Sequence, residues 1–87
     1  MFAVQDSFVV RGRGTVITGP RRSEIGRTIC MGDCLRFTLT DGTLVETTIT
    51  GIEMFLGGIP EADPIVGILL AHDVGKVASG TLVYPVR

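Results

Sequence analysis

Apolar and polar residues alternate along much of this 87-residue chain, at the spacing of two that is typical of β-strands with one buried face. Near the start, the apolar residues fall on even-numbered positions, namely Phe2, Val4, Phe8 and Val10. Asp6 interrupts this face, so we expect it to be a rim residue or a paired one. The pattern predicts a first strand whose even-numbered apolar side chains point into the core.

The second predicted strand covers residues 15–18, TVIT, which are β-branched throughout and therefore favour extended backbone. The connection before it is Gly12-Arg13-Gly14, which is short enough for a tight turn between antiparallel strands. We therefore expect the chain to open with a hairpin.

A second hairpin is predicted around Asp41-Gly42, because this pair separates two alternating stretches and is typical of a two-residue type I′ turn. On the returning strand, residues 44–55, the apolar positions are odd-numbered as far as Ile49 and even-numbered from Ile52. Gly51 lies between them. A glycine at a change of phase indicates a bulge or a sharp bend, which a closing barrel requires.

The last third of the chain predicts a loop over residues 56–64, which contain two Gly and two Pro, and a buried strand over residues 65–71. Residues 81–84 are the last predicted strand. Gly or Pro interrupts every window that could form a helix. Six or seven short strands in so short a chain indicate a small barrel or sandwich.

Composition adds that the chain is one domain, residues 1–87, with 45% hydrophobic and 20% charged residues. No apolar run reaches the roughly 18 residues of a membrane span, and no basic segment followed by an apolar run marks a secretory signal. We therefore expect a cytoplasmic protein without a membrane partner. Met1 followed at once by a strand favours a complete short product.

The formal net charge of −1 conceals an asymmetry. Residues 1–27 hold five Arg against two acidic residues, whereas residues 28–87 hold three basic and seven acidic residues. A basic N-terminal third is suited to RNA, ribosomal phosphate or an acidic protein. Five Arg on a hairpin are equally typical of a solvated strand edge.

Metal and redox chemistry find little support in the sequence. Cys30 and Cys34 together with the distant His72 do not supply four metal ligands at the usual spacing, so we expect two buried or half-buried thiols. No Lys or Arg lies between the two cysteines to lower a thiol pKa. We expect no metal and no cofactor.

The glycine stretch GRGTVITG, residues 12–19, does not form a phosphate-binding loop. Its spacing fits a Walker loop, but Pro20 and Arg21 stand where Lys and Ser or Thr are required. No nucleophile is placed beside His72 and Asp73. We therefore expect no enzymatic activity.

Four motifs occur in order: GRGTVITG at residues 12–19, IxxGD at 29–33, TGIEMF at 50–55 and VGILL at 66–70. Together they resemble the second domain of elongation factor Tu and related translational GTPases, and the resemblance spans essentially the whole chain. It implies an all-β domain, a single six-stranded closed Greek-key β-barrel of the translation-factor domain 2 type. The family's GTP-binding domain is absent, so the resemblance implies no GTPase activity.

In elongation factor Tu this barrel accommodates the 3′-terminal adenosine of aminoacyl-tRNA. The resemblance implies a pocket wall of Val10, Gly12, Val16 and Leu69, with Glu53 as the polar group facing the nucleotide. From the residues alone, Glu53 is also compatible with an ordinary outward-facing side chain.

The neighbouring pocket for the esterified amino acid departs from the family. Phe55 and Leu56 stand where the family has an aromatic residue or His followed by Arg, and Ile65 stands in place of Asn. Residues 57–64 are shorter and more acidic than the family loop, which should repel a tRNA backbone.

Two functions remain open. In the first, a non-catalytic, translation-factor-like module docks on a protein partner of the translation apparatus, such as another translation-factor domain or a ribosomal protein, and an exposed apolar patch lies beside the Arg-rich hairpin. In the alternative, the module binds RNA, a tRNA end or rRNA, with Glu53 at a terminal adenosine. The candidate contacts to phosphates or to the partner are Arg11, Arg13, Arg21 and Arg22.

Overall fold

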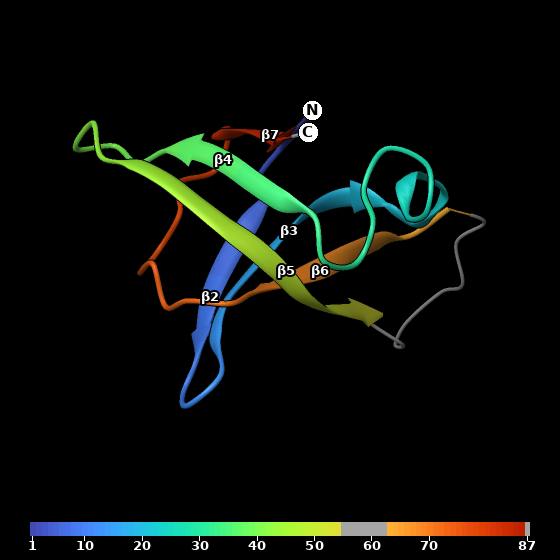
Figure 1. The fold of residues 1–87 in the computed structure, drawn as a ribbon, viewed down its shortest axis with the longest axis horizontal. Helices are drawn as coiled ribbons and strands as arrows, with labels where there is room; N and C mark the ends of the chain where they lie inside the picture. Colours follow the sequence, from blue (N-terminus) through green and yellow to red (C-terminus); the bar gives the residue numbers. More distant parts are fainter. Residues whose placement is uncertain (55–62, 87) are drawn as a thin grey trace.

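The structure is a computed structural model that describes residues 1–54 and 63–86 (Figure 1). Within these residues every regular element is a β-strand, apart from a 3₁₀ turn at Arg22–Glu24. The strands are β1 (Phe2–Ala3), β2 (Asp6–Val10), β3 (Gly14–Arg21), β4 (Cys34–Thr38), β5 (Leu44–Met54), β6 (Ile65–Leu70) and β7 (Leu82–Val86). The predicted all-β class is confirmed.

The strands form one antiparallel sheet in the order β1-β7-β4-β5-β6-β3-β2. The expected six-stranded closed barrel is not confirmed, because the described residues form seven strands and the sheet is not closed. The two strands at its ends, β1 and β2, are consecutive in the chain, with only Val4 and Gln5 between them.

The prediction of a single first strand is wrong, because Val4 and Gln5 interrupt it and separate β1 from β2. Val4 bonds through its backbone to Thr81, whereas the Gln5 N–H donates to the Thr18 carbonyl on β3. The chain leaves β7 and joins β3 at this point, so the alternation of inward-facing and outward-facing side chains shifts by one position. Phe2 and Val4 are buried as expected, but Phe8 is 43% exposed, and Ser7 points inward instead. Val10, the fourth of the even-numbered apolar residues, is half-buried.

The hairpin at Asp41-Gly42 is confirmed, but the predicted turn type is wrong. The Leu39 N–H donates to the Thr43 carbonyl, and the Gly42 N–H donates to the Leu39 carbonyl. Gly42 has a φ of +89°. Asp41 does not have a positive φ, because among the described residues only glycines do. A type I′ turn needs positive φ at both central positions, so this is a three-residue loop with its left-handed residue at Gly42.

The bend predicted at Gly51 is confirmed by the pairing of β5 with β6. Ile49 pairs with Leu70 and Gly51 pairs with Leu69, so Thr50 is the extra residue of a bulge. The buried strand predicted at residues 65–71 is β6, in which every residue after Ile65 is buried.

The sheet is curved (Figure 1). The core side chains come from alternate positions of the strands and from the segments that connect them. The core consists of Phe2, Val4, Ile17, Ile29, Leu35, Phe37, Ile49, Val66, Ile68, Leu70, Val77 and Val83. Val16 and Leu69 are also buried, but they do not belong to this cluster. They lie on the other face of the sheet, where the candidate site is found.

Candidate functional site

The outer face of β2, β3, β6 and β5 is organised in rows of side chains. Directly paired residues of antiparallel strands point to the same side of a sheet. Ile17 and Ile68 belong to the core, so the residues next to them on β3 and β6 point outward. One outward row runs Phe8, Val16, Leu69 and Gly51, and the next runs Asp6, Thr18, Gly67 and Glu53.

Val16 and Leu69 are direct partners across β3 and β6 and form an apolar pair that is 2% and 5% exposed. The next strand offers Gly51 in this row, and a Cβ there would lie 3.4 Å from the Leu69 side chain. The face therefore holds an apolar pair whose Leu69 side chain would be in van der Waals contact with a Cβ at position 51.

Glu53 lies in the adjacent row, opposite Gly67, which has no side chain to compete for the same space. Its carboxylate Oε1 lies 3.5 Å from Nη2 of Arg13, and the two side chains are 42% and 60% exposed. The sequence predicted that the Glu53 carboxylate faces a nucleotide and that the Arg13 guanidinium contacts a phosphate or a partner. In the structure, these two groups contact each other.

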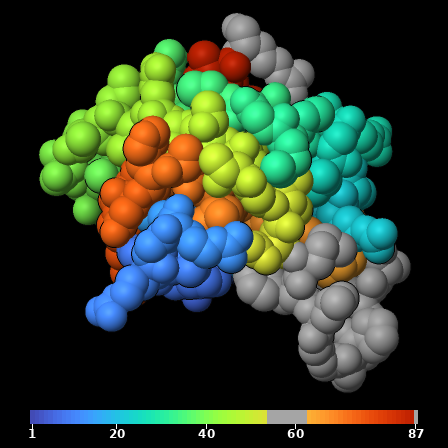
Figure 2. All heavy atoms as spheres, turned by 60° about the horizontal axis from the view of Figure 1, so that its bottom comes forward, coloured from blue at the N-terminus to red at the C-terminus, as the bar shows by residue number. Residues whose placement is uncertain are grey.

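This ion pair crosses the apolar pair. Arg13 directly precedes Gly14 at the tip of the β2–β3 hairpin, whereas Glu53 shares a row with Thr18, at the far side of the Val16 row. Figure 2 shows this side of the molecule, with the blue hairpin atoms beside the orange atoms of β6 and the yellow atoms of β5.

The structure therefore brings together three of the five candidate pocket residues. Val16, Leu69 and Glu53 lie in adjacent rows, and the half-buried Val10 pairs with Gly14 at the end of the hairpin. Gly12 is exposed in the turn itself, with φ at +78° and no atom within 4 Å of where its Cβ would be. Its role here is to form the turn.

Gly14, in contrast, is required by packing. It lies in β3, and a Cβ on it would be 2.5 Å from the carbonyl oxygen of Leu70, which no backbone shift accommodates cheaply. The glycines of the GRGT motif therefore serve a turn and a close strand contact, consistent with the rejection of a phosphate loop from the sequence.

The four candidate arginines do not form one patch. Arg11 and Arg13 lie at the hairpin tip, whereas Arg21 and Arg22 lie at the other end of β3, roughly 23 Å away at 3.3 Å per residue. There, Arg21 Nη1 donates to the Asp63 carbonyl (3.1 Å), and the Arg22 N–H donates to the Pro64 carbonyl (2.8 Å). A single phosphate track along all four would have to span the length of the strand.

Cys30, Cys34 and His72 are the other residues to consider for metal or redox chemistry in the described part of the chain. Cys30 and Cys34 are free, half-buried thiols, as expected. His72 is exposed, and its Nδ1 lies 3.1 Å from the Thr47 hydroxyl. Over residues 1–54 and 63–86, no three His, Cys, Asp or Glu side chains converge in a way that could hold a metal ion.

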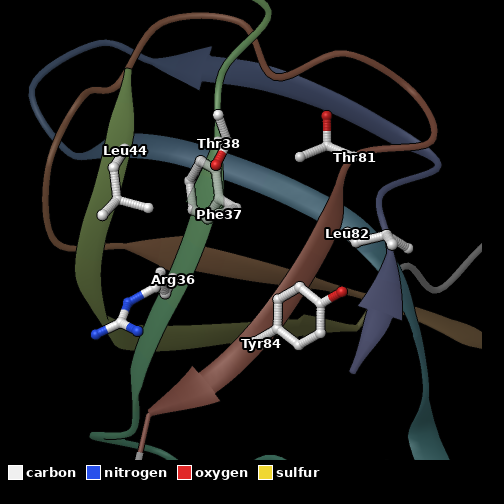
Figure 3. Close-up of a pocket in the computed structure, with 7 residues that line it drawn as sticks. All are labelled: Arg36, Phe37, Thr38, Leu44, Thr81, Leu82 and Tyr84. Carbon is white, nitrogen blue, oxygen red and sulfur yellow. The ribbon is translucent and has the colours of Figure 1, made fainter. Parts of the chain in front are cut away.

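An open groove of about 360 Å³ lies over β4, and the sequence patterns did not single it out. Its lining residues are Arg36, Phe37, Thr38, Leu44, Thr81, Leu82 and Tyr84. Figure 3 shows Leu44 on one side of Phe37 and Thr38, with Leu82 and Tyr84 on the other. Pairing between β4 and β7 ends at Arg36 and Tyr84, so the groove opens where the two strands separate.

The groove has a signal that sequence reasoning missed. Leu44 is out of phase with the inward positions Val45, Thr47 and Ile49, and Leu82 and Tyr84 flank the buried Val83. Leu44 is 59% exposed, and Leu82 and Tyr84 are each 46% exposed. Apolar residues on the outward face of predicted strands could have indicated this surface.

The apolar patch expected beside the hairpin corresponds to Phe8 and Val9 on β2, which are 43% and 46% exposed. They point to opposite sides of the strand, because Phe8 pairs with Val16 and Val9 with Thr15. The groove over β4 is therefore the broader apolar surface of the two.

Among the pocket residues implied by the resemblance, Phe55 and Leu56 lie outside the described residues, as do most of residues 57–64. Ile65 is the first residue of β6 and is half-buried. No protein-family model matches this chain, and no solved structure matches it at a significant level. Among the described residues, no helix is long and apolar enough to cross a membrane.

Proposed function

We propose that this chain is a non-catalytic binding module of the translation apparatus, and that the outer face of β3, β6 and β5 recognises the 3′-terminal nucleotide of an RNA. The observation that carries the proposal is the buried apolar pair Val16 and Leu69, which lies outside the core with Glu53 in the adjacent row. Such a module would act in the cytoplasm, where translation takes place.

The proposal includes the fold type of the second domain of elongation factor Tu. The four motifs found in the sequence support it, and so does the course of residues 2–10. The chain leaves β7 at Val4 and joins β3 at Gln5, so one continuous segment contacts both ends of the sheet. We propose that this segment closes the sheet into a barrel.

The chemistry of the face suits an adenosine. A nucleobase needs flat apolar surface together with a few fixed polar contacts. Phe8, which is 43% exposed, offers accessible apolar surface in the row of Val16 and Leu69, which are themselves only 2% and 5% exposed. The Glu53 carboxylate can accept a hydrogen bond from the exocyclic amino group or a ribose hydroxyl.

The proposal is tested by a two-dimensional NMR titration of the labelled protein with a short CCA-ended RNA, and with the same RNA lacking its 3′ adenosine. The expected shifts are confined to Val10, Val16, Glu53, Leu69 and their neighbours, and disappear without the adenosine. They persist at near-physiological salt, because base recognition does not depend on counterion release. Glu53→Ala should weaken the preference for the adenosine.

Shifts limited to the arginines and removed by salt would contradict recognition of the nucleotide. So would equal responses to the two RNAs.

A second function, docking on a protein partner, is favoured by the groove over β4. Exposed Leu44, Leu82 and Tyr84 surround a concave surface on a small domain, which is a common property of interaction sites. The test is cosedimentation with purified ribosomes and with isolated ribosomal proteins. Leu82→Ser should reduce binding, whereas Val9→Ser, an equally exposed apolar residue outside the groove, should not.

A further inference from the structure

The ion pair between Arg13 and Glu53 lies across the face proposed to bind a nucleotide. Glu53 is the carboxylate of that face, and the Arg13 guanidinium approaches it to 3.5 Å from the hairpin tip. The apolar pair Val16 and Leu69 lies in the row between the two backbones. A ligand that binds Glu53 through Oε1 therefore competes with Arg13 for this oxygen.

We propose that Arg13 is a gate on this face: it occupies Glu53 in the free protein and moves to the phosphate of the bound nucleotide when the ligand takes its place. This inference rests on the proposed nucleotide-binding function. It adds to that function a selectivity for a phosphorylated terminal nucleotide over an uncharged nucleoside.

The energetics of the pair allow such an exchange. Both side chains are about half exposed, and ion pairs of this kind are weak because water and salt screen them. A guanidinium released from a carboxylate can instead bind phosphate through charge-assisted hydrogen bonds. Gly12 and Gly14 flank Arg13 and have positive φ, which forms the turn that places Arg13 at the hairpin tip.

The charged groups around Glu53 are consistent with this role for Arg13. In its row, Thr18 is neutral and Gly67 has no side chain, while Asp6 is the far member, on β2. Asp6 is itself engaged, because its Oδ1 accepts a hydrogen bond from the Ser7 N–H at 2.8 Å. Arg13 is therefore the cation that the described contacts assign to Glu53.

The test compares two probes, adenosine and adenosine 5′-monophosphate, by NMR titration of the full chain and of its Arg13→Gln variant. For the uncharged adenosine, removing the gate should tighten binding by up to about five-fold, because no ion pair has to be broken. For the monophosphate, the same substitution should weaken binding by about two- to ten-fold, because the phosphate loses its partner. The two effects have opposite signs.

Lys76→Gln is the matched control, since it removes one positive charge close to the hairpin without touching Glu53. Lys76 follows Gly75, whose carbonyl accepts a hydrogen bond from the Thr15 hydroxyl. This variant should leave the ratio of the two affinities unchanged. Arg13→Lys, which keeps the charge but not the forked donors, should lie between wild type and Arg13→Gln.

The outcomes separate the gate from the function on which it rests. If both probes bind but Arg13→Gln changes their affinities in the same direction or not at all, the gate is refuted and the nucleotide site stands. If neither probe shifts the resonances of Val16, Leu69 or Glu53 in wild type or in Arg13→Gln, the nucleotide site is refuted and the gate with it.

Discussion

Asp63 is a residue whose charge connects two distant segments of the chain. Its carboxylate accepts hydrogen bonds from the Ser23 hydroxyl (2.7 Å) and the Ser23 N–H (2.8 Å), just beyond the end of β3. These bonds, first the one from the hydroxyl, hold the pKa of Asp63 below its ordinary value of 3.8, and the positive charges of Arg21 and Arg22 act in the same direction. Ser23 is 40 positions earlier in the chain, so folding brings the two together.

We predict a corresponding pH dependence of stability. Because the pKa of Asp63 is lower in the folded protein than in the unfolded chain, its stabilising contribution is present above the ordinary value of 3.8 and is lost as the pH falls through the folded value. NMR titration of the carboxyl group should show this low pKa. Ser23→Ala, which removes the largest cause, should move the pKa toward 3.8. A wild-type carboxyl that titrates at or above 3.8 would contradict the assignment.

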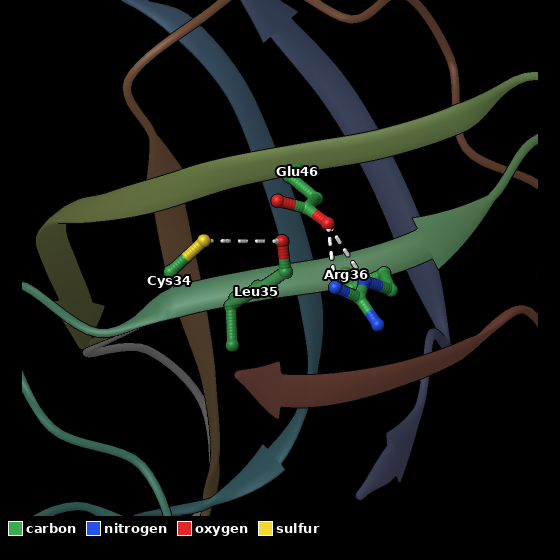
Figure 4. A network of polar contacts seen from close by, with 4 residues as sticks. All are labelled: Cys34, Leu35, Arg36 and Glu46. Carbon is green, nitrogen blue, oxygen red and sulfur yellow. Dashed lines mark hydrogen bonds and ion pairs between the residues drawn. The ribbon is translucent and has the colours of Figure 1, made fainter. Parts of the chain in front are cut away.

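Between elements, the β4–β5 hairpin is joined by a cross-strand ion pair. Arg36 and Glu46 are direct partners in the ladder, and Glu46 Oε1 lies 2.8 Å from Arg36 Nε and 2.7 Å from Nη2 (Figure 4). Both side chains are about half exposed, at 49% and 46%. The geometry is favourable, but exposure limits the gain.

A double-mutant cycle with Arg36→Ala and Glu46→Ala should give a coupling free energy of about 0.2–1 kcal/mol, the range for exposed cross-strand charge pairs. Urea unfolding is the suitable measurement, because guanidinium chloride would itself screen the pair. The coupling should fall as salt is added. A value that salt does not change would mean that the two residues interact through packing and not through charge.

Local patterns were sufficient for most of the elements. Alternation identified the strands on both sides of Asp41-Gly42, and the change of phase around Gly51 identified the bulge. The turn type at Gly42 was missed because a three-residue loop and a two-residue loop both place Asp-Gly between strands. The break at Val4 and Gln5 was missed because it depends on which distant strand each residue pairs with, and no local pattern records that.

At the scale of the whole molecule, local patterns also predict only part of the candidate site, because they do not record contacts between distant segments. The resemblance supplied Val16, Leu69 and Glu53, and the strand register places them in adjacent rows. Neither alternation nor motif indicated that Arg13 contacts Glu53, because 40 positions separate them and the contact depends on how the hairpin lies over β6. The groove over β4 also arises only where β7, from the end of the chain, separates from β4.

The proposed closure of the sheet depends on contacts between β2 and the segment that precedes β7. Ser7 is buried, and its hydroxyl donates to the Val77 carbonyl (2.9 Å) while accepting from the Val77 N–H (2.8 Å). Val77 is itself in the core. One hydroxyl thus satisfies both backbone groups of a buried residue 70 positions away. The contact joins β2, at one end of the strand order, to the segment that leads into β7, the neighbour of β1 at the other end.

Ser7→Ala should therefore destabilise the protein by about 2–6 kcal/mol, because it leaves the N–H and the carbonyl of Val77 without this partner, and each such buried group costs roughly 1–3 kcal/mol. Ser79→Ala, at an exposed serine in the same segment, should stay within about 0.5 kcal/mol of wild type. Urea unfolding measures both, and amide exchange at Val77 should accelerate only in Ser7→Ala. If Ser7→Ala were as stable as Ser79→Ala, this contact would not stabilise the fold, and the closure would have to depend on the backbone bonds of Val4 and Gln5 alone.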